Sequence, residues 1–161
     1  MIEVDVETDA WLRDVPDVLD RARLAAEAAL AATGANPQSE ISVLLADDAE
    51  VAELNQRFRK KAGPTNVLSF PAPAFAKPHL GDVILAYETC AREAREQSKT
   101  LCDHTSHLVA HGVLHLLGWD HMTDAEADAM EALERTVLAG LGIADPYAAQ
   151  DETDGERRRP D

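Results

Sequence analysis

The stretch His111-Gly-Val-Leu-His115-Leu-Leu-Gly118-Trp-Asp-His121 restricts the structure of this chain more than any other. It falls at the end of an apolar segment, residues 103–117, that predicts a helix, and Gly118 is placed to end that helix. Because His111 and His115 are four residues apart, their imidazoles lie on one helix face, about 6 Å apart along the axis. The stretch therefore predicts a helix that offers two nitrogen ligands to one ion.

A third ligand is expected from His121, which follows the turn at Gly118. His107 lies on the same helix face, but it is about 12 Å along the axis from His115, too far for both to reach one ion through bonds near 2 Å. We therefore interpret His107 as structural. Three neutral imidazoles leave a fourth position open, as in catalytic zinc sites. The alternative is that these histidines are ordinary core or surface residues, but their spacing favours one Zn²⁺ per chain.

The segments around this helix alternate between strand-like and helix-like patterns. Helices are expected over residues 14–32, 47–62, 88–99, 103–117 and from Thr123 to about residue 141. Strands are expected over residues 2–7, 40–46, 67–70 and 82–86. The pattern predicts one α+β domain over residues 1–150, with a small mixed sheet of about four strands covered by about five helices. Residues 151–161 form an acidic, arginine-containing tail that we expect to be disordered.

Composition limits the possible functions further. A net charge of −15 argues against a general nucleic-acid binder, because phosphate contacts need local positive potential. The segment Arg57-Phe-Arg-Lys-Lys61 is an exception, and it is either an anion contact beside the metal or a solvated helix end. Two cysteines are too few for a disulfide framework. With no secretory signal and no apolar run long enough for a membrane span, a soluble cytoplasmic protein without membrane contact is expected.

The residue that follows His111 argues against one class of zinc enzyme. Zinc peptidases of the His-Glu-x-x-His type place their general base there, and this chain has Gly112. A zinc ion can still activate water and polarise a phosphoryl oxygen. Phosphodiester cleavage also benefits from an arginine that pairs with the phosphate, and Arg59 is the candidate, with Lys61 beside it. Taken alone, an arginine in this position is more often a surface charge, so a catalytic role for Arg59 needs more than its spacing.

The motifs taken together resemble the YbeY endoribonucleases. The resemblance covers about residues 40–147, and within these motifs we find no departure from the family pattern. The segments that carry it are His111–His121, Leu54-Asn55, Arg59, Lys61, Pro64-Thr-Asn-Val-Leu-Ser-Phe-Pro71, Leu80-Gly-Asp-Val83 and Asp145-Pro-Tyr147.

This resemblance implies a zinc-dependent endoribonuclease that prefers single strands and acts in 3′-end maturation of 16S rRNA and in ribosome quality control. It implies that His111, His115 and His121 hold the zinc and that Arg59 handles RNA. The implied partners are single-stranded precursor rRNA, the ribosome or small-subunit proteins, and the assembly GTPase Era, whereas DNA is not expected. Either water or the 2′-hydroxyl of the RNA could be the attacking group.

Supporting roles are expected for several polar residues. Lys61, Asn66 and Ser69 are candidates for lining the substrate groove, although Asn66 and Ser69 could simply satisfy the turn before a strand. Asp120 could hold a ligand imidazole or the turn, or face water. Asn55 could brace Arg59 from the preceding helical turn. The competing functions are a zinc metallopeptidase and a ribosome-assembly factor in which zinc is structural.

Overall fold

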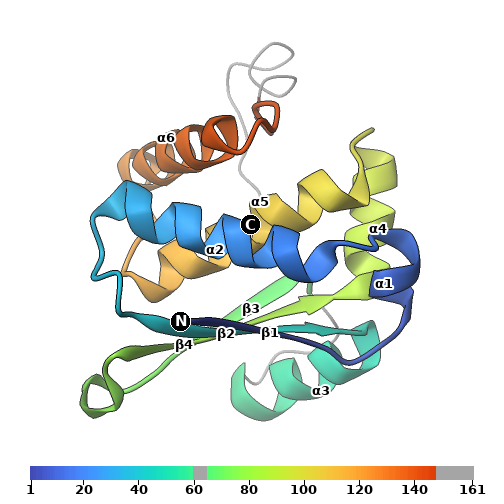
Figure 1. Cartoon of the computed structure of the whole chain (residues 1–161), viewed down its shortest axis with the longest axis horizontal. Helices are drawn as coiled ribbons and strands as arrows, with labels where there is room; N and C mark the ends of the chain where they lie inside the picture. The colour runs from blue at the N-terminus through green and yellow to red at the C-terminus, as the bar shows by residue number, and fades with distance from the viewer. Residues whose placement is uncertain (60–64, 148–161) are drawn as a thin grey trace.

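A mixed four-stranded sheet in the order β1-β2-β4-β3 crosses the lower half of the molecule, with helices on both of its faces (Figure 1). The computed structural model describes residues 1–59 and 65–147, apart from the side chain of Arg59. Strands β1 (Ile2–Val6), β2 (Glu40–Ala46) and β4 (His79–Ala86) are parallel, and β3 (Val67–Pro71) runs antiparallel to β4. β1 and β3 are therefore the two edge strands. The predicted sheet of four strands is confirmed.

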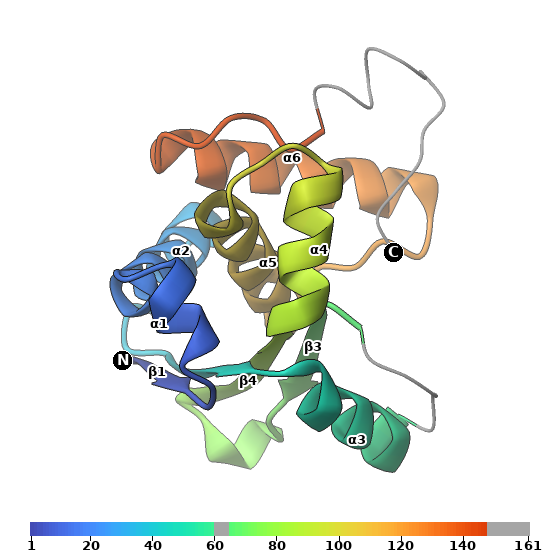
Figure 2. The ribbon, with the colours of Figure 1, turned by 90° about the vertical axis from the view of Figure 1, so that its right-hand side faces the viewer.

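Helices cover both faces of the sheet. The described residues form α1 (Ala10–Asp14), α2 (Val18–Thr33), α3 (Asp48–Arg59), α4 (Tyr87–Glu96), α5 (Leu101–Leu116) and α6 (Asp124–Gly140), with a 3₁₀ turn, η1 (Ala74–Ala76). α2, α4 and α5 lie on one face and α3 lies on the other, while α6 packs on the outer side of α2 and α5 (Figure 2). This arrangement confirms the predicted α+β class. None of the described helices is long and apolar enough to cross a membrane.

The first helical region differs from its predicted bounds of residues 14–32. A separate short helix, α1, comes first, and α2 begins only at Val18. Val15 has φ −135° and ψ 84°, because a residue before proline is disfavoured in the α region, and Pro16 follows it. α1 is held in place by Trp11, whose buried indole Nε1 donates a hydrogen bond to the carbonyl oxygen of Ala46 at 2.9 Å.

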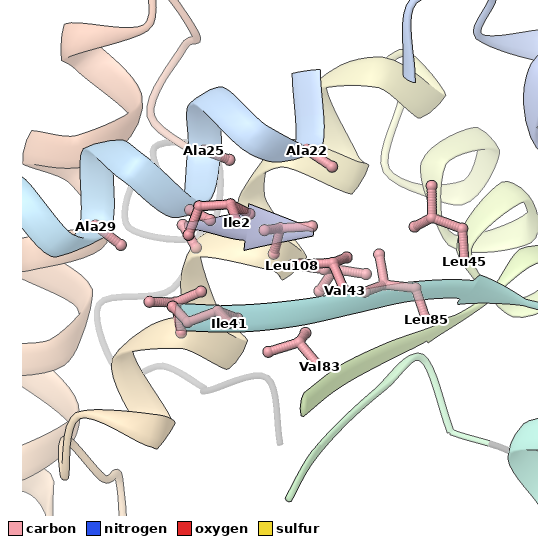
Figure 3. Close-up of a cluster of buried hydrophobic side chains, with 14 of the residues drawn as sticks. Ile2, Ala22, Ala25, Ala29, Ile41, Val43, Leu45, Val83, Leu85 and Leu108 are labelled. Carbon is pink, nitrogen blue, oxygen red and sulfur yellow. The ribbon is translucent and has the colours of Figure 1, made fainter. Parts of the chain in front are cut away.

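The main core lies between the sheet and the α2–α5 layer. Small side chains on α2 let this helix sit close to the strands and to α5: Ala22, Ala25, Ala26 and Ala29 are all fully buried. Figure 3 shows Ala25 and Ala29 above Ile2 and Ile41, with Leu108 of α5 beside them. A second cluster, which includes Val51, Leu68 and Ile84, fills the space between α3 and the opposite sheet face. α5 is therefore fixed by packing on several sides.

Candidate metal centre

Three imidazoles meet at the C-terminal end of α5. His111, His115 and His121 each offer one ligand nitrogen, and these atoms all lie within 4.8 Å of one another. The ring centroids are 4.7 Å apart for His111 and His115, and 5.1 Å apart for His115 and His121. Nitrogen ligands of a tetrahedral zinc lie about 3.4 Å apart, as bonds of 2.0–2.1 Å require. Small rotations of the rings would therefore bring them onto one ion.

The turn after α5 brings His121 to the other two histidines. Gly118 has φ +99°, and its N–H donates to the carbonyl oxygen of His115, while the N–H of Trp119 donates to that of Leu114, both at 3.0 Å. These two bonds form a Schellman motif, which reverses the chain and favours glycine at this position. Oδ1 of Asp120 then accepts a hydrogen bond from the backbone N–H of His121 at 2.7 Å. The structure thus places the carboxylate of Asp120 on the turn.

A buried carboxylate from α6 orients the first of the three histidines. Glu134 is 1% exposed, and its Oε2 lies 2.6 Å from Nδ1 of His111. Its Oε1 accepts from Nε2 of His107 at 2.7 Å and from the hydroxyl of Tyr147 at 2.5 Å. Burial raises the pKa of Glu134, but the hydrogen bonds from His107 and His111 outweigh burial and keep that pKa well below its usual range. Glu134 is therefore a carboxylate with three donors.

This arrangement makes the three histidines suitable for a metal ion. Because Nδ1 of His111 donates to Glu134, the lone pair for an ion is on Nε2. A carboxylate behind a ligand imidazole is the usual way of fixing its tautomer and direction. Burial, and then the neighbouring His111 and His121, lower the pKa of His115, which favours the neutral form that binds metal. The donor set fits one divalent ion with a further position left for another ligand.

The helix between the first two histidines is pressed against the sheet. A Cβ added at Gly112 would lie 2.6 Å from Cγ1 of Val83 and 3.2 Å from Oγ of Ser69. The hydroxyl of Ser69 donates to the carbonyl oxygen of Gly112 at 3.0 Å, which fastens α5 to β3. The position where a zinc peptidase carries its glutamate therefore faces β4 and has no room for a side chain.

The remaining predicted site residues lie in different places. Nδ2 of Asn66 donates to Oε1 of Glu93 at 3.0 Å, and the same oxygen accepts from Nε2 of His104 at 2.9 Å. Asn66 thus lies toward the N-terminal half of α5, two turns from His111. Asn55 is buried on α3. The side chain of Arg59, all of Lys61 and the predicted tail of residues 151–161 fall outside the described residues.

Two residues of the centre are not among those predicted from the sequence. Glu134 lies between the buried residues Met130 and Val137 on α6. A charged residue within such an apolar stripe is a usable signal, because burial of an unpaired carboxylate is costly and implies buried partners. Tyr147, only 3% exposed, belongs to the motif Asp145-Pro-Tyr147, which contributes to the family resemblance but carries no predicted role.

The fold and the site together define an α+β protein with a cluster of three histidines that could hold a metal ion. Comparison with known proteins identifies it further: the chain belongs to the endoribonuclease YbeY family, whose family model matches residues 4–142. This confirms the resemblance drawn from the motifs.

Similar proteins agree with this assignment. A relative from Paramagnetospirillum magneticum, named endoribonuclease YbeY, is 55% identical over 158 residues, which cover 92% of this chain and 96% of the relative. A relative of the same name from Parvibaculum lavamentivorans is 51% identical, over 92% of this chain and 85% of its own. The solution structure of TM1509 from Thermotoga maritima superposes with a TM-score of 0.59 over 99% of this chain and 98% of that one. At 22% identity, that likeness supports the fold alone.

Proposed function

We propose that this protein is a zinc-dependent endoribonuclease that prefers single strands and acts in 3′-end maturation of 16S rRNA and in ribosome quality control. The observation that carries the proposal is the three-histidine cluster, His111, His115 and His121, in a chain of the endoribonuclease YbeY family. Three neutral imidazoles with an open position suit zinc, and one ion per chain is expected. The chain would act in the cytoplasm on precursor rRNA, with the ribosome, small-subunit proteins and the GTPase Era as partners.

In this proposal some residues of the centre bind the ion or position its ligands, and Arg59 contacts the substrate. The bound ion would polarise a phosphoryl oxygen and lower the pKa of a water ligand. Glu134 fixes the direction of His111, and Asp120 holds the turn that carries His121. Arg59 is proposed to pair with the phosphate and stabilise the charge that develops on it.

The weaker members of the proposed site are the other substrate contacts. Lys61 would add a positive charge next to Arg59, and Asn55 would support Arg59 from within α3. Asn66 and Ser69 already donate to Glu93 and to the carbonyl of Gly112. A direct contact with RNA would therefore require each of these two residues to exchange its present partner.

A combined measurement of metal content and cleavage tests the proposal. Purified protein should contain about one zinc per chain and should cut a single-stranded 16S rRNA 3′ precursor. His115→Ala should lose both zinc and cleavage, whereas His79→Ala, whose imidazole lies 3.7 Å from Asp82 and outside the cluster, should keep both. Full cleavage by metal-free His115→Ala protein would overturn the proposal.

Analysis of the RNA product and rescue of deficient cells separate the remaining alternatives. A product that ends in a 2′,3′-cyclic phosphate would identify the 2′-hydroxyl as the attacking group, and a 3′- or 5′-phosphate without that intermediate would identify water. A peptidase is disfavoured because Gly112 is packed against Val83. An Arg59→Ala protein that keeps zinc, fails to cut RNA and still restores rRNA processing in deficient cells would instead indicate an assembly factor.

A further inference from the structure

A large aromatic side chain is exposed near the end of α3. Phe58 is 61% exposed, and its ring contacts the ring of Phe70 edge-to-face, with centroids 5.9 Å apart and planes at 73°. The guanidinium carbon of Arg57 lies over the same ring, 5.4 Å from its centroid. A single exposed apolar residue is ordinary. An exposed ring that is supported by a second ring and accompanied by an arginine is the combination that proteins use to stack nucleic-acid bases.

The use of Arg57 differs from that of other arginines on the surface. Five arginines on α1, α2, α4 and α6 pair with carboxylates, and two of these five, Arg13 and Arg135, also lie over tyrosine rings. The five are Arg13, Arg21, Arg23, Arg92 and Arg135. Arg57 lies over a phenylalanine ring but takes part in none of these ion pairs, and it begins a run in which four of five residues are basic, within a chain of net charge −15. Phosphate contact in such a protein requires a local positive region.

This aromatic cluster lies at the same sheet edge as the metal centre. Phe70 belongs to β3, which is an edge strand, and α3 and α5 lie on opposite faces of the sheet beside it (Figure 2). A Cβ added at Gly81 would lie 2.3 Å from the carbonyl oxygen of Phe70 and 2.9 Å from Cδ2 of Leu116. Leu116 directly follows His115. The backbone of Phe70 therefore approaches the end of α5 that carries the histidines, and β3 has no further strand on its outer side among the described residues.

We propose that Phe58, with Arg57 and Phe70, forms a stacking site for one base of single-stranded RNA whose backbone crosses the β3 edge toward the metal centre. The proposal rests on the proposed endoribonuclease function. Stacking tolerates any base, because every base has a π-face, and it requires a base that is not already stacked in a duplex. The site would therefore contribute to a preference for single strands and would act on substrate binding rather than on the chemical step.

Steady-state cleavage of a short single-stranded RNA by the zinc-loaded protein tests this site. Phe58→Ala should raise KM about 10-fold with kcat within about 2-fold, as expected for the loss of one stacked base. Phe75→Ala is the matched control, because Phe75 is 90% exposed but lies on η1, and it should leave KM unchanged. Phe58→Leu keeps an apolar side chain against Phe70 and should lose affinity like Phe58→Ala, so it replaces that variant if the alanine protein does not fold.

A direct reporter of stacking complements the kinetics. Tryptophan placed by Phe58→Trp should keep KM near that of the unchanged protein and should lose fluorescence when oligouridylate is added, whereas Phe75→Trp should not. Unchanged KM in both Phe58→Ala and Phe58→Leu, with normal cleavage by the unchanged protein, would overturn the stacking site and leave the endoribonuclease function standing. Equal rises of KM for Phe58→Ala and Phe75→Ala would also overturn it. Absence of RNA cleavage by the unchanged, zinc-loaded protein would reject both.

Discussion

Glu134 is the residue on which the geometry of the centre depends. Its carboxylate joins His111 to His107 and Tyr147 inside the core. We expect Glu134→Gln to lower zinc affinity about 10- to 100-fold, because an amide holds the imidazole less firmly and makes its ring nitrogen less basic. Competition with a fluorescent chelator measures the affinity. Glu96→Gln, on the surface of α4, is the control, and equal affinities in the two variants would contradict this role of Glu134.

The close packing of Gly112 against Val83 should make the protein sensitive to any side chain at this position. Gly112→Ala should destabilise the protein by about 1–3 kcal/mol, since the new methyl group would meet Cγ1 of Val83 at 2.6 Å. Urea unfolding measures the free energy of unfolding. Adding Val83→Ala makes room for the methyl group, so the double variant should lose less stability than the sum of the two single variants. Strict additivity would show that the two side chains do not meet.

The sequence predicts contacts between single residues where both residues lie on the same helix. The spacing of His111 and His115 places both on one helix face through helix geometry alone, so the sequence suffices to pair them. Glu134 cannot be placed in the same way, because it reaches His111 from a helix 23 residues further along the chain. The orientation of α6 against α5 determines that contact. Asn66 shows a different case, since its position in the sequence allows either a substrate contact or a contact within the turn, and its amide in fact donates to Glu93 of α4.

The turn after α5 both ends the helix and brings His121 beside His111 and His115. Gly118→Ala should destabilise the fold by about 1–2 kcal/mol, because an alanine at φ +99° is strained, and should weaken zinc binding by shifting His121. Gly140→Ala is the control, because a Cβ there meets nothing within 4 Å and helix propensity improves. Thermal unfolding and zinc titration measure the two effects. A Gly118→Ala protein with unchanged unfolding temperature and zinc affinity would contradict this account of the turn.

Element types are more predictable than element arrangement. Alternation identifies β1 and β2, short apolar runs identify β3 and β4, and Thr123 with Glu126 identifies the start of α6, where the structure has a full capping box. The sequence does not predict α1 as a separate helix, because five residues are too few for a periodic pattern. The position of α1 depends on the hydrogen bond from Trp11 to the carbonyl oxygen of Ala46. The strand order and the antiparallel direction of β3 depend on pairings between distant segments, which local patterns do not record.

The stability of the whole fold in acid should depend on Glu93 of α4, whose carboxylate accepts hydrogen bonds from His104 of α5 and from Asn66 just before β3. Burial raises the pKa of Glu93, but hydrogen bonds from His104 and Asn66 outweigh it, so the pKa is lower in the folded chain. Such a group stabilises the fold above its unfolded pKa, about 4.3, and this contribution is lost as pH falls through the folded value. Urea midpoints between pH 7 and pH 3 should therefore fall less steeply for Glu93→Gln. Parallel curves for both proteins would contradict this.

The net charge of the whole chain is a poor guide to its function. A value of −15 argues against a nucleic-acid binder, yet the chain belongs to a family of endoribonucleases. Recognition of phosphate depends on the potential within about one Debye length, roughly 8 Å at physiological salt, rather than on the sum over the molecule. A basic run of a few residues can therefore coexist with a strongly acidic remainder.

The edge strand β1 has a consequence for how copies of the protein meet. Among the described residues no strand pairs with its outer edge, which therefore offers backbone N–H and carbonyl groups to a strand of another copy, the usual route to edge-to-edge aggregation. Glu3 and Asp5 are exposed along this strand. If two copies joined through β1, these like charges would face one another, and the negative charge of the whole chain would add to the repulsion. We therefore expect the acidic composition to keep the sheet edges of neighbouring copies apart at high concentration.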